Sequence, residues 1–468
     1  MFSLVKNEKI LKLNNKWEFE IILCVIFMLF GILGWQINYA LGAIPTILLS
    51  VALMLIYNKF KYAIPAILEL LFSIGTGFSV DSFPFHIVVP VVLFIAFIIF
   101  FTIYNFKKNK LKHIKSCIGM IILSISYIIP IFWCSVITDE YTMFYIMYFS
   151  WLMYTVLYII LCFNLEKDSF RMTVFAISSL VFLIGYEIII TVIKMHLENP
   201  DENILSFWYY LGWGLCNEAG IMLCFIMPFI FYEFIKSNKI YLTLFAIFKM
   251  FFLLLCIVLT TARGAILFGG IEFALLSIVL LIIKYDDKKI KLTYFITLCS
   301  MVVVVGMAII VRTNILDDFH TNIFYQNLGA NGRDIIYKLG NDSFTESPRN
   351  VIFGSGIVST IRPDELWSGK QDTFVVYHNS LLEVLVSSGI IGGIGFGIHL
   401  FEKFKGVFKK GLAFCLIFFI GYLLVDAYGM IDNTYGMYYY MVPLAIAMAT
   451  FYHSKNIELF DTNKNELF

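Results

Sequence analysis

The chain has 468 residues, of which 60% are hydrophobic and only 14% are charged, and its formal net charge at pH 7 is +1. Its mean hydropathy is +0.85. A soluble protein would carry about 25% charged residues, so the composition excludes a soluble globular domain. Apolar runs of about 20 residues recur along most of the chain, and each is long enough to cross the hydrocarbon core of a membrane. The composition therefore predicts an all-α, polytopic helical membrane protein.

The apolar runs predict about 14 spans, because a helix needs roughly 20 apolar residues to cross a bilayer. In chain order, the predicted spans cover residues 20–38, 40–57, 62–79, 85–105, 117–136, 142–163, 172–193, 206–230, 240–259, 264–283, 292–311, 379–401, 411–427 and 435–452. The N-terminal segment MFSLVKNEKILKLNNKWEFE lacks the short apolar core and small-residue cleavage site of a signal peptide. The first apolar run is therefore predicted to remain as a span.

The basic residues predict the orientation of these spans. With the N-terminus inside, the inward segments hold 25 of the 34 Lys and Arg residues, the outward segments hold 8, and Lys249 lies within a span. Cytoplasmic loops are enriched in Lys and Arg, so both termini are predicted to be cytoplasmic. Arginine departs from this pattern, since Arg171 alone among the six arginines lies in an inward segment. The other five indicate an anionic ligand at the outer face, and they are Arg263, Arg312, Arg333, Arg349 and Arg362.

The spans divide the chain into three parts. Residues 1–311 are predicted to form a transmembrane bundle of about 11 spans, and residues 379–468 about 3 further spans and a cytoplasmic tail. Between them, residues 312–378 form one large extracytoplasmic loop. This loop is predicted to be ordered, because it mixes aromatic and aliphatic residues with its charges. Its segment RDIIYKLG is predicted to be a short helix with Ile335, Ile336 and Leu339 on one face.

The turn Thr260-Thr261-Ala262-Arg263-Gly264 is a candidate anion site. It connects two spans in a tight outer turn, and the second of these spans begins at the outer face. A helix N-terminus presents free N–H groups and a partial positive charge, to which Arg263 adds a full charge. The alternative is an arginine whose charged end reaches the lipid headgroups.

The segment Tyr377-His378-Asn379-Ser380 lies where the large loop returns to the membrane. Asn379 or Ser380 is predicted to cap the helix that follows, because both residue types are preferred at that position. His378 then stands at another outward helix start, where a neutral imidazole can take a proton from a hydroxyl acceptor. The alternative is an interfacial histidine or a simple cap.

The other outward arginines are considered in turn. Arg333 begins the predicted loop helix, where a guanidinium suits a phosphate, and the alternative is a surface ion pair with Asp334 or Glu346. Arg349 and Arg362 are weaker candidates, and Arg312 marks the end of a span.

Other polar residues indicate less specific roles. Asp317, Asp318 and His320 are read as a solvated loop, so no metal site is predicted. Charged residues within spans are predicted to face the bundle interior, and they leave a transporter as an alternative function. A pair between Glu218 and Lys249 is conceivable. The charged residues within spans are Glu69, Glu187, Glu218, Lys249, Glu272 and Asp426. The nine cysteines lie in or beside apolar runs and predict no disulfide framework. The chain has no phosphate-binding glycine motif and no nucleic-acid signature.

In order and spacing, these segments resemble the O-antigen ligase and polymerase superfamily of bacterial membrane glycosyltransferases, the WaaL and Wzy proteins. The resemblance rests on the outward TARGA turn, on NGRDIIYKLG and SPRNVIFGSGIVS in the large loop, and on YHNSLLEVLVSSGIIGGIGF after it. It implies a GT-C-like, metal-independent glycosyltransferase without a cofactor. Its catalytic positions match Arg263, Arg333 and His378. The resemblance also favours Arg349, Asn379, Gly264 and Tyr377 as substrate-binding residues.

The resemblance implies an enzyme of the bacterial inner membrane with an extracytoplasmic active site. Its donor would be an oligosaccharide linked to undecaprenyl pyrophosphate, and its other partners would be membrane lipid and a chain-length regulator protein. The favoured reading is a repeat-unit polymerase of O-antigen, lipopolysaccharide or capsule synthesis. A ligase that moves the glycan to another acceptor is the first alternative. A polysaccharide flippase or other transporter, and a structural envelope subunit, are alternatives of different classes.

Overall fold

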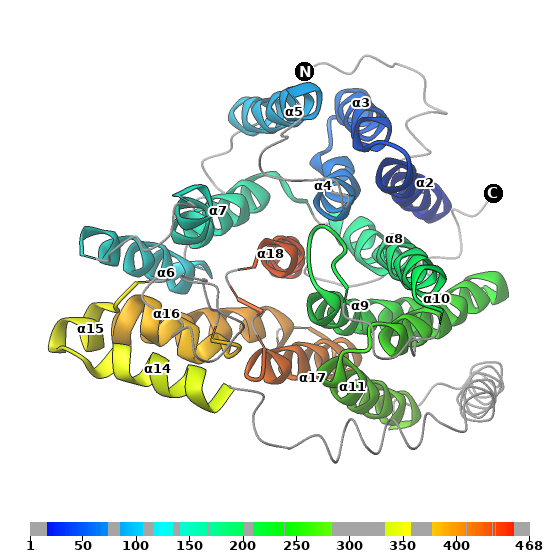
Figure 1. Ribbon diagram of the computed structural model, residues 1–468. Helices are drawn as coiled ribbons and strands as arrows, with labels where there is room; N and C mark the ends of the chain where they lie inside the picture. The colour runs from blue at the N-terminus through cyan, green and yellow to red at the C-terminus, as the bar shows by residue number, and fades with distance from the viewer. Residues whose placement is uncertain are drawn as a thin grey trace.

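The computed structural model describes residues 16–73, 85–105, 116–133, 141–166, 168–200, 209–237, 239–282, 333–356, 377–408, 410–432, 434–435 and 437–453. Over these residues the fold is all-helical, as predicted, apart from an isolated bridge between Tyr210 and Leu215 (Figure 1). Each predicted span overlaps a described helix except the span at 292–311, which lies outside the described residues, as do Arg312, Asp317, Asp318, His320 and Arg362.

The helices before the large loop are α2 (Trp17–Gln36), α3 (Tyr39–Tyr57), η1 (Phe60–Tyr62), α4 (Ala63–Phe72), α5 (Phe85–Tyr104), α6 (Ile118–Ile128), η4 (Ile129–Phe132), α7 (Tyr141–Asn164), α8 (Ser169–Glu198), α9 (Cys216–Lys236), α10 (Ile240–Leu259) and α11 (Arg263–Ile282). Those that follow are α14 (Arg333–Thr345), α15 (Pro348–Phe353), α16 (Ser380–Phe408), α17 (Leu412–Gly429) and α18 (Tyr438–His453). Within the described residues, 8 of these helices are long and apolar enough to cross a membrane, and shorter apolar helices lie at Val89–Tyr104, Ile118–Phe132 and Phe149–Asn164. The prediction of a polytopic helical membrane protein is therefore confirmed.

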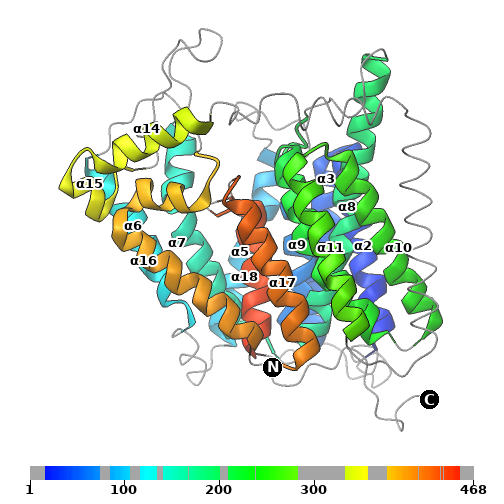
Figure 2. The same cartoon turned by 90° about the horizontal axis from the view of Figure 1, so that it is seen from below.

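The bundle has two ends with different character. One end carries the starts of α9, α11 and α16 together with α14 and α15, and we call it the His378 end (Figure 2). In the interior, 94% of the α9 span is buried, so the other helices nearly enclose it. The starts of α2 and α10 lie together at the opposite end, where Lys239 Nζ approaches Glu18 Oε1 at 3.5 Å.

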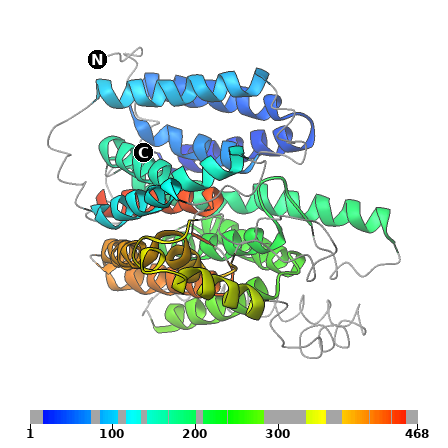
Figure 3. The same ribbon diagram turned by 60° about the vertical axis from the view of Figure 1, so that its left-hand side comes forward.

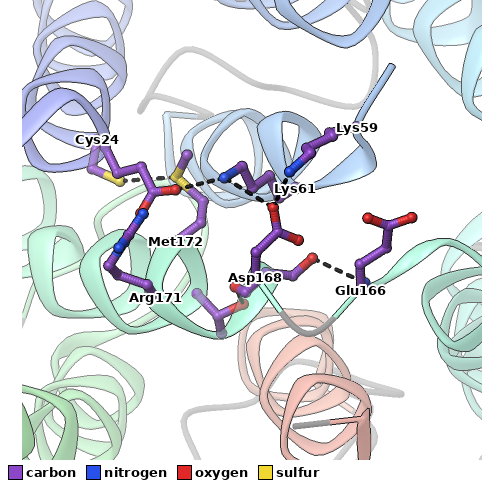
Figure 4. A network of polar contacts seen from close by, with 10 residues as sticks. Cys24, Lys59, Lys61, Glu166, Asp168, Arg171 and Met172 are labelled. Carbon is purple, nitrogen blue, oxygen red and sulfur yellow. Dashed lines mark hydrogen bonds and ion pairs between the residues drawn. The ribbon is translucent and has the colours of Figure 1, made fainter. Parts of the chain in front are cut away.

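An ion network joins α2, η1 and α8 at the opposite end (Figure 4). Glu20 is fully buried and accepts hydrogen bonds from Lys61 Nζ, at 2.7 Å, and from Arg171 Nε. Lys59 and Lys61 both pair with Asp168. Burial raises the pKa of Asp168, but the charges of Lys61 and Lys59 outweigh it and hold that pKa below its ordinary value. The network fixes how the three elements meet and gathers cations at this end.

A second ion pair crosses the interior of the bundle. Lys249 of α10 and Glu233 of α9 are buried, and Lys249 Nζ lies 3.0 Å from Glu233 Oε2 and 2.9 Å from Ser178 Oγ of α8. The conceivable pair of Lys249 with Glu218 is therefore wrong. By a rise of 1.5 Å per residue, Glu218 lies about 27 Å from the end of α9 and Lys249 about 14 Å from the start of α10, too far apart along the bundle to meet.

Replacing Lys249 with methionine is expected to lower the free energy of unfolding by about 3–5 kcal/mol, because Glu233 would remain buried without its cation. The double variant Lys249→Met/Glu233→Leu is the matched control and is expected to recover most of that loss. Thermal unfolding in detergent, followed by tryptophan fluorescence, measures both variants. A Lys249→Met variant with the same melting temperature as the wild type would contradict the role assigned to this pair.

The described part of the large loop folds onto α16. The predicted helix RDIIYKLG is α14, and its Ile336 forms a small core with Tyr377 and Val386. The α14 and α15 helices, drawn in yellow, lie against α16, drawn in orange (Figure 3). This supports the prediction that the loop carries ordered structure.

The α16 helix is broken where α15 contacts it, whereas the sequence predicted one continuous span. Gly389 has a φ of 68° and ψ of −169°, values that interrupt the helix. Gly354 has a φ of 89°, and a Cβ there would lie 2.4 Å from Ser387 O. A Cβ on Gly389 would lie 2.3 Å from Ile352 O. Glycine is required at both positions because the two backbones touch.

Candidate active site

The first part of the candidate site is the turn between α10 and α11. Thr260 Oγ1 donates to Ile257 O at 2.7 Å and accepts from Ala262 N at 3.3 Å. Thr261 has a φ of 58°, which is rare for a β-branched residue and reverses the chain within a few residues. The first helical hydrogen bond runs from Ile266 N to Ala262 O, so the amides of residues 263–265 are not used by the helix.

Arg263 stands at this helix start with an exposed side chain. Within the described residues no carboxylate forms an ion pair with it. A guanidinium and three helix-start amides thus occur together at the start of α11, which is the composition of an anion-binding site.

Gly264, the next residue, allows a close contact with α17. A Cβ at this position would lie 2.4 Å from Tyr428 Cε2. Tyr428 also stacks on Phe268, with ring centroids 5.5 Å apart. The structure therefore shows Gly264 as a packing position, and its predicted contact with substrate stays a prediction.

The second part of the candidate site is the start of α16. Asn379 caps the helix, as predicted, because its Oδ1 accepts hydrogen bonds from Leu381 N and Leu382 N, both at 3.0 Å. Its Nδ2 donates to Met430 O at 2.9 Å, which ties the cap to the segment after α17. Asn379 is thus engaged by the protein on both ends of its amide.

His378 precedes this cap and pairs with Asp432. Its φ of 49° lies in the left-handed region, which is uncommon for a residue other than glycine. His378 Nδ1 lies 3.2 Å from Asp432 Oδ1, and the two side chains are 39% and 8% exposed. A carboxylate acceptor favours the proton on Nδ1, which leaves Nε2 as the ring nitrogen able to take a proton. The pair has the composition of an oriented general base.

Asp432 was missed by the sequence analysis. The segment Met430-Ile431-Asp432-Asn433 was counted only as an acidic outward loop. A carboxylate between the last two spans was the available signal, but 54 residues separate it from His378 and nothing local indicates the contact.

Tyr428 connects the two parts of the candidate site. Its ring covers Gly264, beside Arg263, and its carbonyl accepts a hydrogen bond from Asp432 N at 3.0 Å. Arg263 and His378 therefore lie at the same end of the bundle, each one contact away from the end of α17. The sequence predicted this grouping only from the direction of the spans.

The other predicted residues have different surroundings. Tyr377 is fully buried, its N–H donates to Glu383 Oε2 at 3.3 Å, and a Cβ on Gly340 would lie 2.7 Å from its ring. This burial argues against the predicted contact of Tyr377 with substrate and favours a role in holding α14 against α16. Arg333 begins α14, but its side chain is outside the described residues.

Arg349 is exposed near the start of α15. Its guanidinium carbon lies 5.0 Å from the centroid of the Trp133 ring, so a cation–π contact ties it to the segment after η4. Its role in substrate binding stays a prediction. In the described part of the chain, no three His, Cys, Asp or Glu side chains group as metal ligands.

Part of the chain matches a known protein family. A family model described as O-antigen ligase matches residues 248–397, a stretch that contains the Arg263 turn, α14, α15 and His378. No curated protein matches the chain significantly. The predicted resemblance to the O-antigen polymerase and ligase superfamily is therefore confirmed over this part of the chain.

Proposed function

We propose that the protein transfers a growing glycan from undecaprenyl pyrophosphate to a lipid-linked repeat unit at the outer face of a bacterial membrane. The observation that carries the proposal is the His378–Asp432 pair, which lies at the same end of the bundle as the Arg263 helix start. A base for the acceptor and a cation for the leaving group are the two devices that such a transfer requires.

The proposed reaction is a substitution at the anomeric carbon of the donor sugar. An acceptor hydroxyl forms the new C–O bond while the bond from the anomeric carbon to the pyrophosphate oxygen breaks. His378 Nε2 takes the hydroxyl proton, and Asp432 stabilises the resulting imidazolium. The departing undecaprenyl pyrophosphate gains one negative charge, which Arg263 and the first amides of α11 neutralise, with Arg333 as a second cation. No metal ion is needed in this scheme.

The proposed orientation follows from the distribution of cations. Lys59, Lys61, Arg171 and Lys239 gather at the end opposite His378, as expected for a cytoplasmic end. The His378 end would then face outward, where lipid-linked glycans are available. Both chain termini would be cytoplasmic.

A ligase is the second candidate, because the matching family model is described as O-antigen ligase. It would use the same leaving group and the same base but would accept a different hydroxyl. A flippase or other transporter is less favoured, since two of the charged residues within spans, Lys249 and Asp426, form ion pairs with Glu233 and Lys403 inside the bundle. Such pairs need no transport role.

A reaction with purified components tests the proposal. The full-length protein in lipid nanodiscs is incubated with undecaprenyl-pyrophosphate-linked repeat units isolated from a strain that lacks this gene. We expect a ladder of longer glycans on the carrier lipid, and we expect the same ladder when a chelator is present. Transfer only to an added lipid A core or other acceptor would instead indicate a ligase. A reaction that stops with chelator and resumes with a divalent ion would contradict the metal-independent mechanism.

A further inference from the structure

A tight turn before α9 borders the candidate active site and takes no part in the chemistry proposed so far. Leu211 N donates to Gly214 O at 2.8 Å, and Cys216 N donates to Tyr209 O at 3.1 Å, so residues 209–216 close on themselves. The Tyr209 hydroxyl donates to Leu259 O at 3.0 Å, at the last residue of α10. The turn is therefore docked directly beside the Arg263 turn.

Glu218 projects from the first turn of α9 and is held by one of its two oxygens. Glu218 Oε2 accepts a hydrogen bond from Leu215 N at 2.7 Å, in the manner of a capping box. The side chain is half-buried, and Oε1 makes no hydrogen bond to the described part of the chain. The carboxylate is thus fixed in place with one acceptor oxygen still available.

Two exposed tyrosines flank this carboxylate. Tyr210 and Tyr438 are 55% and 44% exposed, and Tyr210 is bridged to Leu215, the residue whose N–H Glu218 binds. The Tyr438 hydroxyl donates to Trp213 O at 3.0 Å, and the Tyr210 hydroxyl donates to Gly212 O. Their hydroxyls are therefore used by the turn, and what remains exposed to a ligand is their aromatic rings.

This combination suits a sugar better than a lipid. Interfacial tyrosines that anchor a protein in a membrane direct their hydroxyls to water and headgroups, whereas these hydroxyls are bonded to the protein backbone. A pyranose ring has an apolar face of C–H groups that stacks on an aromatic ring, and its hydroxyls donate hydrogen bonds to a carboxylate. The surface of Glu218, Tyr210 and Tyr438 presents both requirements at once.

The surface adjoins the proposed base. Asn217 O, one residue before Glu218, accepts a hydrogen bond of 3.4 Å from the Tyr428 hydroxyl. Tyr428 O in turn accepts a hydrogen bond from Asp432 N at 3.0 Å, and Asp432 contacts His378. A carboxylate would repel a pyrophosphate, so this surface fits the neutral hydroxyls of a sugar beside His378 rather than the leaving group beside Arg263.

We infer that Glu218, Tyr210 and Tyr438 form the subsite that binds the acceptor sugar and presents its hydroxyl to His378. The inference rests on the proposed function, because only a glycan-transferring enzyme has such an acceptor. Glu218 would accept a hydrogen bond from one sugar hydroxyl, and the two rings would hold the apolar face of the sugar.

The variant Glu218→Gln separates binding from folding. Glutamine keeps the capping box, because its side-chain oxygen accepts from Leu215 N. Its NH₂ group then points outward, so the acceptor offered to the sugar becomes a donor. Tyr438→Leu removes one ring face, and Tyr186→Leu serves as a matched control because Tyr186 bonds Gln36 elsewhere in the bundle.

The test measures initial rates with radiolabelled undecaprenyl-pyrophosphate-linked repeat unit as acceptor and a fixed, saturating amount of elongated carrier-linked glycan as donor. We expect Glu218→Gln to raise the KM for the acceptor by about 10-fold or more, the loss expected for a hydrogen bond to a charged group. We expect Tyr438→Leu to raise the same KM by about 2- to 10-fold, because the sugar loses one aromatic face. The KM for the donor is expected to stay unchanged in both variants, as is the melting temperature of Glu218→Gln. Tyr186→Leu is expected to keep both KM values of the wild type.

The outcomes separate the inference from the proposed function. A wild-type protein that elongates, with variants whose acceptor KM is unchanged, would overturn the subsite. A rise in the donor KM alone would also overturn it, since the surface would then hold the donor glycan. A wild-type protein that transfers no glycan would instead refute the proposed function itself.

Discussion

Replacing Arg263 with alanine is expected to slow glycan transfer by about 1,000-fold or more, a loss typical of removing a cation that stabilises a departing phosphate group. Arg263 is exposed at the start of α11, and the helix amides that remain carry only a partial charge. Initial rates of repeat-unit elongation by purified protein measure the effect. Lysine at this position is expected to restore part of the activity, because it supplies the charge without the planar fork.

Lys194→Ala is the matched control for Arg263→Ala. Lys194 is a cation on α8 that lies over the ring of Trp35, 5.5 Å from its centroid, away from the candidate site. Its removal is expected to leave elongation unchanged, and both variants should express and melt as the wild type does. Polymer of normal length from Arg263→Ala would refute the assignment of Arg263 to the leaving group.

Replacing His378 with alanine is expected to slow transfer by about 100- to 10,000-fold, the usual contribution of a positioned general base. Asp432→Asn is expected to cost about 10- to 100-fold, because an amide no longer holds the imidazole with its proton on Nδ1. The 3.2 Å contact between His378 Nδ1 and Asp432 Oδ1 carries this expectation. Single-turnover rates at saturating acceptor measure both variants.

The two substitutions should not be additive if Asp432 acts through His378. The double variant His378→Ala/Asp432→Asn is then expected to be no slower than His378→Ala alone. His453→Ala, at the far end of α18, is the control and should remain active. If the fold-losses of the two single variants multiply in the double variant, Asp432 contributes independently of His378. A fully active His378→Ala variant would refute the assignment of His378 as the base.

Much of the candidate site was accessible from sequence because it lies at helix starts. Arg263 and His378 stand where apolar runs begin, and a helix start is a local feature that hydropathy and capping residues reveal. Asn379 was predicted as a cap for the same reason, and its two hydrogen bonds confirm it. The resemblance to a known family then linked these separate positions into one site.

The residues that sequence analysis missed or misjudged depend on contacts between distant segments. Asp432 follows α17 and contacts His378, which precedes α16. Glu218 stands at the start of α9, and no apolar pattern in the sequence connects that helix start with His378. Tyr377 was expected at the substrate but is buried under Gly340, because α14 folds back onto α16. The partner of Lys249 is Glu233 rather than Glu218, because the position of a residue along the bundle axis decides which side chain it contacts.

The sequence by itself determined the class of this protein and the approximate positions of its described apolar helices, because hydropathy is a property of local segments. It also indicated the family through short motifs in a fixed order. Only the tertiary structure decided which carboxylate supports His378, which residue Gly264 accommodates and that α16 breaks at Gly389. Those features arise where helices far apart in the chain touch, and packing of that kind is set by the whole bundle rather than by any one segment.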